Sequence, residues 1–200
     1  MVGIRSRCFE VPVVGSKERK NHGRDLVLET EEQACLADGV ALFDGHQIYV
    51  AEAALLHDPK LEKKLKDRFK VARCMRDSWN CQIKSIARES VPPVGLTVFG
   101  SASFEDETTF LAMDFTGTYR LRQIGRMLVP LKRLHFGRRM ATSVKASLKF
   151  ALDVEEETIR RRLLEPSTED LSAACDAIEQ TRTTPMKETK KRRLSGVYHS

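Results

Sequence analysis

The most regular alternation of hydrophobic and polar positions lies in residues 144–152. The apolar side chains take every second position: Val144, Ala146, Leu148, Phe150 and Leu152. The positions between them are occupied by Lys145, Ser147, Lys149 and Ala151. Because successive side chains of an extended chain point to opposite faces, this period predicts a β-strand with one face toward a core.

Other apolar runs predict a sheet in the middle of the chain. Residues 94–99, 108–115 and 118–124 are expected strands, and residues 11–14 are expected to form a short edge strand. Residues 40–43 and 47–50 flank Asp44-Gly45, which is typical of the turn of a β-hairpin. Pro130 to Arg139 is expected to be a basic loop before the strand at 144–152.

Helical signals occur on both sides of this sheet. Thr30 can cap a short helix at 31–37. Asp58 can cap a longer helix in which Pro59 takes the first position. The apolar positions of the longer helix are Leu61, Leu65, Phe69, Ala72 and Met75. This spacing gives one apolar face, so either a core helix with a solvated lysine face, which we favour, or a helix lying on a membrane is expected.

Further helices are expected at 78–89, ended by Pro92-Pro93, at 155–164 and at 168–179. The pattern as a whole predicts an α+β fold in a single compact domain. Helices are expected in the N-terminal half, an antiparallel sheet in the middle, and helices at the C-terminal end. The expected divisions are a flexible basic segment at 1–25, a globular α+β domain at 26–180 and a disordered basic tail at 181–200.

The positive net charge indicates that this globular protein has anionic partners. The 200 residues include 34 Lys and Arg against 28 Asp and Glu, a net charge of +6. This balance favours nucleic acid, acidic lipid or an acidic protein surface, although a protein that is merely basic is the simpler alternative. No apolar run reaches the roughly 18 residues of a membrane span, so a membrane contact would be peripheral.

Residues 115–152 concentrate this charge, because they contain nine cations and no acidic residue. The nine are Arg120, Arg122, Arg126, Lys132, Arg133, Arg138, Arg139, Lys145 and Lys149. If several share a face, they predict a surface that binds acidic lipid, or the phosphates of nucleic acid without reading bases. Aromatic residues are few here, which argues against a dedicated single-strand reader.

The sequence contains no recognisable catalytic or metal-binding motif. There is no His-Glu-x-x-His, no Gly-rich phosphate loop and no Gly-x-Ser-x-Gly. Cys74 and Cys81 are spaced unlike a zinc pair, and the five cysteines form no disulfide framework, which favours reduced thiols in a cytosolic or nuclear compartment. We therefore predict no metal, no cofactor and no enzymatic activity, while a site assembled in space stays open.

The C-terminal tail carries a second basic run. Lys190, Lys191, Arg192 and Arg193 are typical of a nuclear localisation signal. Ser195 follows two arginines and is a candidate phosphorylation site for a basophilic kinase. A phosphate there would add almost two negative charges and weaken the basic run.

The order of several features resembles a known family. A strand ends in Phe99-Gly-Ser101, a Gly117-Thr-Tyr-Arg-Leu121 segment follows, and a proline-led basic loop contains His135-Phe136 and Arg138-Arg139. The stretch Leu148 to Glu155 then runs into acidic residues. Over about 55 residues, 98–153, this arrangement resembles the matrix proteins of rhabdoviruses and their negative-strand relatives.

The resemblance implies a compact α+β fold and a structural role. That role is to condense the ribonucleoprotein, bind acidic membrane from inside, self-associate and help budding. One departure is that Pro92-Pro93 precedes Val94-Gly95 rather than a Pro-Pro-x-Tyr motif, which puts budding through host sorting machinery in doubt. The nuclear-type tail would suit a plant-infecting member.

Together these features predict a viral matrix-like structural protein that binds acidic membrane, the ribonucleoprotein or both, and self-associates in virion assembly. Its expected partners are acidic membrane, nucleocapsid or nucleic acid, further copies of itself and host nuclear import receptors. Its expected locations are the virion and, in the host cell, the nucleus or the cytoplasmic face of membranes. The alternative is a nuclear-targeted nucleic-acid-binding protein, such as a viral movement or silencing-suppressor factor.

Overall fold

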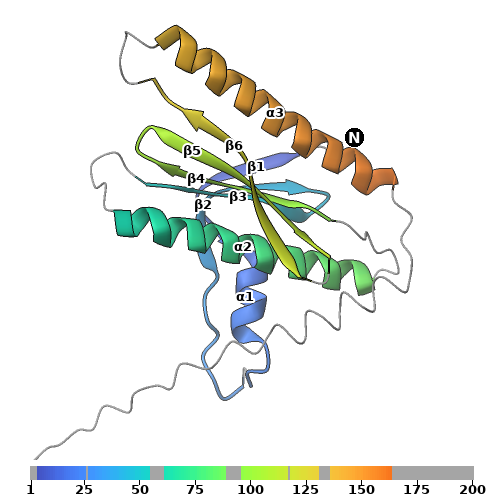
Figure 1. Cartoon of the computed structure of the whole chain (residues 1–200). Coiled ribbons are helices and arrows are strands. Elements are labelled where there is room, and N and C mark those ends of the chain that lie inside the picture. The colour runs from blue at the N-terminus through green and yellow to red at the C-terminus, as the bar shows by residue number, and fades with distance from the viewer. Residues whose placement is uncertain are drawn as a thin grey trace, which may run out of the picture.

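The protein has an α+β fold in which helices cover both faces of a six-stranded sheet (Figure 1). The computed structural model describes residues 4–25, 27–54, 61–88, 96–116, 118–130 and 136–163. The strands are β1 (Arg5–Val13), β2 (Cys35–Phe43), β3 (His46–Ala53), β4 (Val98–Phe104), β5 (Glu107–Phe115) and β6 (Tyr119–Leu128). The helices are α1 (Val14–Asn21), α2 (Leu61–Arg88) and α3 (Phe136–Leu163). The predicted fold class is therefore confirmed.

The strands follow one another across the sheet in sequence order, and all neighbours are antiparallel except β3 and β4. The prediction of an antiparallel sheet is thus corrected at its centre. Parallel neighbours need a long crossover, and α2 supplies it along one face of the sheet. In Figure 1, α2 lies below the sheet and α3 above it.

Several predicted strands are confirmed. The hairpin of β2 and β3 turns at Asp44 and Gly45, whose φ angles of 50° and 81° suit a type I′ turn. The strands expected at 108–115 and 118–124 correspond to β5 and β6. The strand expected at 94–99 is displaced, because β4 runs from Val98 to Phe104 and shortens the turn before β5.

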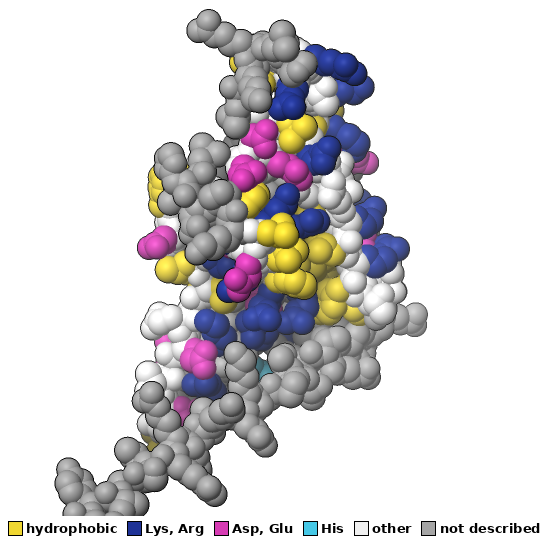
Figure 2. All heavy atoms as spheres, turned by 60° about the vertical axis from the view of Figure 1, so that its left-hand side comes forward, with side chains coloured by type: hydrophobic (Ala, Val, Ile, Leu, Met, Phe, Trp, Pro, Cys, Tyr) yellow, Lys and Arg dark blue, Asp and Glu magenta, His cyan; other side chains and the backbone are white. Residues whose placement is uncertain are grey.

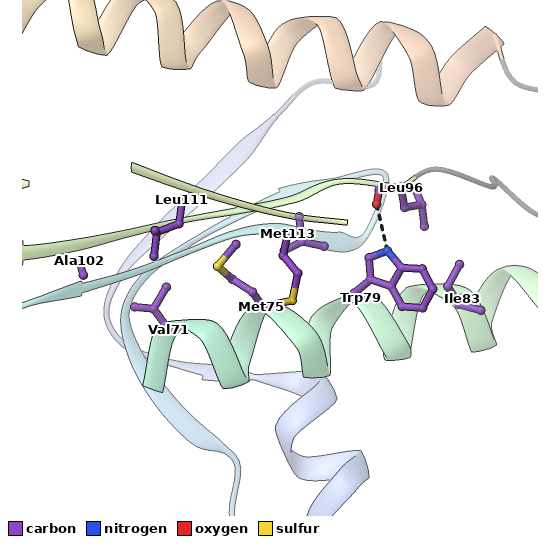
Figure 3. Close-up of a cluster of buried hydrophobic side chains, with 9 residues drawn as sticks. Val71, Met75, Trp79, Ile83, Leu96, Ala102, Leu111 and Met113 are labelled. Carbon is purple, nitrogen blue, oxygen red and sulfur yellow. Dashed lines mark hydrogen bonds between the residues drawn. The ribbon is translucent and has the colours of Figure 1, made fainter. Parts of the chain in front are cut away.

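The main core lies between α2 and the sheet (Figure 3). Val71, Met75, Trp79 and Ile83 recur every four residues along α2 and are almost fully buried. The indole Nε1 of Trp79 donates a hydrogen bond of 2.9 Å to the carbonyl oxygen of Leu96. This bond satisfies the one polar atom of the largest side chain in the core.

The expected helices at 59–75 and 78–89 are a single helix, α2, within the described residues. Of its predicted core positions, Met75 is fully buried and Ala72 packs against the core, as expected. Leu61, Leu65 and Phe69 are 69%, 50% and 75% exposed, which corrects the prediction at those three positions. The buried series starts at Val71, two residues after Phe69. Two residues correspond to slightly more than half a helical turn, so Phe69 points away from the face of α2 that carries Val71.

The N-terminal segment belongs to the fold, which corrects the expectation of a flexible segment at 1–25. β1 pairs with β2 and buries Val11 and Val13, while α1 packs on α2. Gly15 allows this approach, because a Cβ atom there would lie 2.1 Å from the carbonyl oxygen of Asp77. The helix expected at 31–37 is also wrong, since Cys35 begins β2.

The largest correction concerns residues 144–152, which form part of the 28-residue helix α3 and not a strand. The same helix includes the end of the expected basic loop and most of the expected helix at 155–164. The helix expected at 168–179, the tail at 181–200, the basic run Lys190 to Arg193 and Ser195 lie outside the described residues, as do Lys132 and Arg133.

Candidate functional site

Helix α3 is attached to the sheet at its first turns by a serine. Ser143 is 4% exposed. Its Oγ donates a hydrogen bond of 2.6 Å to the carbonyl oxygen of Leu128 and accepts one of 3.1 Å from the same residue's N–H. This pair of bonds fixes the beginning of α3 against the end of β6.

The middle of α3 is anchored by one aromatic ring. Phe150 stacks on Phe110 with ring centroids 4.5 Å apart and contacts Tyr49 and Phe99 at 5.7 and 5.8 Å. Burial raises the pKa of the Tyr49 phenol, whose hydroxyl shares a 2.5 Å hydrogen bond with Ser101. Phe150 is therefore the chief apolar contact between α3 and the sheet.

The end of α3 is held by buried charges. Glu157, 5% exposed, accepts hydrogen bonds from the backbone N–H of Thr97 at 2.8 Å and from Nε of Arg161 at 3.0 Å. Arg161 also donates to the carbonyl oxygen of Thr97 and to the side chain of Gln82 on α2. Burial lowers the pKa of Arg161, and the pairing with Glu157 opposes that shift. The inner face of α3 is thus largely polar.

The outer face of α3 carries a row of exposed apolar side chains, which we call the outer row. Its members are Phe136, Met140, Val144, Leu148 and Leu152. They recur every four residues and are between 38% and 63% exposed. With small neighbours they line an open groove of about 680 Å³. An apolar series that faces away from the core is a candidate contact surface.

A line of cations accompanies the outer row. Arg138, Lys145 and Lys149 are spaced by seven and four residues and so lie along one side of the helix. Lys149 bonds Asp153 at 2.9 Å, and the acids Glu155 and Glu156 follow. The first half of α3, residues 136–152, contains no acid, so its outer face combines apolar and positive character.

Two of the predicted cations are neutralised by an acid from the adjacent strand. Arg120 and Arg122 donate to the nearly buried carboxylate of Asp114 at 2.7 and 2.9 Å. They line a cavity of about 550 Å³ between the sheet and α3, where Glu157 and Arg160 also lie. The cavity carries both signs of charge, and its two β6 arginines already have a partner.

Three other predicted cations converge on a second, smaller pocket, which we call the arginine pocket. Arg126, Arg138 and Arg139 line it with Leu128 and Thr142, and its volume is about 350 Å³. Figure 2 looks at the side where the first turns of α2 and α3 lie and shows Lys and Arg side chains there among hydrophobic and acidic ones.

A β-bulge separates the arginines of β6. Arg122 pairs with Ala112 and Arg126 pairs with Thr109, with an irregularity between Phe110 and Leu111. Because Ala112 and Thr109 face opposite sides of β5, the bulge turns Arg126 away from the face that carries Arg122. The seven predicted cations that the structure describes therefore do not form a single surface.

The outer row was missed from the sequence, although its spacing was present. The i, i+4 series from Phe136 to Leu152 is a helical signal, but residues 144–152 also fit a period of two. Interpreting residues 144–152 as a strand puts Val144, Leu148 and Phe150 on the same, core-facing side.

Within the part of the chain that the structure describes, no three His, Cys, Asp or Glu side chains are grouped as metal ligands. Among those residues, too, no helix has the length and apolar character to cross a membrane.

Comparison with protein-family models, curated proteins and solved structures finds no match to this chain.

Proposed function

We propose that this protein is a non-enzymatic, matrix-like structural protein that binds acidic membrane surfaces through the outer row and its line of cations. The observation that supports this best is the orientation of α3. Ser143, Phe150 and Glu157 hold its inner face on the sheet, and its apolar outer row faces outward. An amphipathic helix with apolar and basic residues on its free face is the usual element of a protein that lies on a bilayer.

Charge complementarity favours acidic lipid as the partner of this face. Between residues 136 and 152 the cations Arg138, Lys145 and Lys149 stand beside the apolar side chains, with no acid among them. Acidic lipid offers both an apolar layer and a negative surface. A nucleic acid would use the cations but leave the apolar row in water, so it is the weaker candidate.

The expected binding is weak and reversible. Each half-exposed apolar side chain that leaves water contributes about 1 kcal/mol, and each cation near an acidic bilayer contributes about as much. Five apolar residues and the two cations that have no carboxylate partner among the described residues, Arg138 and Lys145, give roughly 7 kcal/mol, from which the loss of motional freedom must be subtracted. Self-association, which the resemblance also implies, would strengthen attachment by multiplying such contacts.

The test is flotation with phosphatidylserine vesicles, with phosphatidylcholine vesicles as the uncharged reference and RNA as a competitor. The variant Leu148→Ser with Leu152→Ser removes the centre of the outer row. Ile159→Ser is the matched control, since Ile159 is 49% exposed on the same helix but lies outside the outer row. The double variant is expected to lose most of its flotation, and the control to keep it.

Other results would replace the proposal. If the intact chain binds RNA and ignores vesicles, the nucleic-acid alternative takes its place. If it binds neither, but sedimentation shows dimers that the double variant loses, the outer row is an interface between copies. If the double variant floats as well as the control, the outer row does not contribute to membrane binding.

A further inference from the structure

We infer that the arginine pocket binds a headgroup that carries two or more phosphates close together, such as that of a polyphosphorylated inositol lipid. This inference rests on the proposed function and names the lipid class that the membrane face would prefer. It concerns different atoms from the outer row, so the two can fail separately.

The pocket is built by two elements that are fixed to each other. Arg126 and Leu128 come from the end of β6, and Arg138, Arg139 and Thr142 come from the first turns of α3. The two hydrogen bonds between Ser143 and Leu128 hold these segments in contact. A volume of about 350 Å³ is in the range of small-ligand sites, which are roughly 300–1,000 Å³.

The arginines of the pocket are weakly neutralised by the described part of the chain. Arg126 lies 3.9 Å from Glu107 and Arg139 lies 3.8 Å from Asp106, both longer than a hydrogen bond. No carboxylate among the described residues pairs with Arg138. Arg120 and Arg122, by contrast, hold Asp114 at 2.7 and 2.9 Å. Among the described arginines of residues 115–152, those without a close carboxylate partner are therefore the three of this pocket.

Three guanidinium groups around one pocket favour a ligand with several negative charges. Each group can donate two parallel hydrogen bonds to a phosphate, and their mutual repulsion is relieved only by a polyanion. The phosphatidylserine headgroup, with its own ammonium, suits such a pocket less well. Arg138 belongs both to the pocket and to the line of cations beside the outer row, so a headgroup bound here would sit next to the membrane-binding face.

The first arm of the test uses soluble probes. Titration calorimetry with inositol 1,4,5-trisphosphate, and with inorganic phosphate as the single-phosphate reference, measures the pocket without a bilayer. Arg126→Gln is expected to weaken trisphosphate binding about tenfold, because a charge-assisted hydrogen bond is worth about 1.4 kcal/mol or more. Thr142→Glu, which leaves all three arginines in place and adds a carboxylate, is expected to abolish it.

Arg120→Gln is the matched control. Arg120 lies on the same strand as Arg126, and their side chains are 52% and 55% exposed, but Arg120 is bonded to Asp114. Its removal is expected to leave trisphosphate binding unchanged. Melting temperatures of all variants establish that they fold.

The second arm compares vesicles that contain phosphatidylinositol bisphosphate with phosphatidylserine vesicles of equal total charge. The intact chain is expected to prefer the bisphosphate vesicles several-fold, and Thr142→Glu to lose that preference while still binding phosphatidylserine. The inference is overturned if the soluble trisphosphate does not bind, binds no better than phosphate, or binds Thr142→Glu as well as the intact chain. Phosphatidylserine binding that persists in those cases leaves the proposed function standing.

Discussion

Asp77 is a buried carboxylate that connects α1 to the centre of α2. Its side chain is wholly inaccessible to solvent, and Nε of Arg19 lies 2.9 Å from both carboxylate oxygens. Burial raises the pKa of Asp77, because the charged form loses its hydration, and the bonds from Arg19 oppose that rise. The net direction is upward, so ionised Asp77 is less favourable in the folded chain than in the unfolded one.

The sign of this shift predicts how stability depends on pH. Above about pH 4, the pKa of an aspartate in an unfolded chain, the unfolded state releases the proton of Asp77 more readily than the folded state. The free energy of unfolding of the natural chain, relative to that of Asp77→Asn, should therefore fall as the pH rises from about 4 through the folded pKa. Urea denaturation of both proteins across this range measures the difference. A difference that grows with pH would mean that Arg19 outweighs burial.

At the scale of elements, α3 has two faces that lie in different surroundings. Phe150 lies among the aromatic rings of the sheet, and Leu148 is 60% exposed in the outer row. In a strand these two residues would share a face, whereas in a helix they point almost oppositely.

This difference predicts unequal effects of truncation. Phe150→Ala should lower the free energy of unfolding by about 2–3 kcal/mol, because it empties the main apolar contact under α3. Leu148→Ala should change it by no more than about 0.5 kcal/mol, as is usual at an exposed site. Denaturant titration of the two variants provides the measurement. Equal losses would show that both side chains face the core.

The elements that were predicted correctly are those with a strong local signal. The Asp44-Gly45 turn, the apolar run of β5 and the alternation of apolar and polar residues at the start of β6 specify a hairpin and two strands without help from distant residues. The helix α1 could not be found in this way, because its position depends on the contact of Gly15 and Arg19 with Asp77. Residues 144–152 fitted two periods equally, and the sheet beneath Phe150 selects the helix.

The candidate site was predicted in part. The sequence identified the cations, and Arg126, Arg138 and Arg139 do converge in the structure. Their separation from Arg120 and Arg122 could not be read from residues 115–152 alone. It depends on the bulge in β6 and on the position of Asp114 opposite Arg120, both of which are features of strand pairing.

At the scale of the molecule, the face opposite the main core carries the basic and apolar surface. If lipid binding combines both, salt should remove only part of it, because screening weakens the cations and leaves apolar burial intact. Lys145→Gln with Lys149→Gln should therefore flatten the dependence of vesicle flotation on salt. The double variant Leu148→Ser with Leu152→Ser should bind vesicles weakly, and its residual binding should keep the salt dependence of the intact chain.

Vesicle flotation of these variants and of the intact chain, measured from about 50 to 500 mM salt, separates the contribution of the cations from that of apolar burial. An unchanged salt dependence after removal of both lysines would mean that neither contacts the lipid.

The parallel pairing of β3 with β4 has a consequence for how the chain folds. On either side of that pair lie antiparallel neighbours that are joined by short turns: β2 with β3 on one side, and β4 with β5 and β5 with β6 on the other. Such neighbours need short loops and can form early, whereas β3 and β4 meet only across the connection that contains α2. We therefore expect the two halves to be joined late, when Val71 to Ile83 pack over the seam between them.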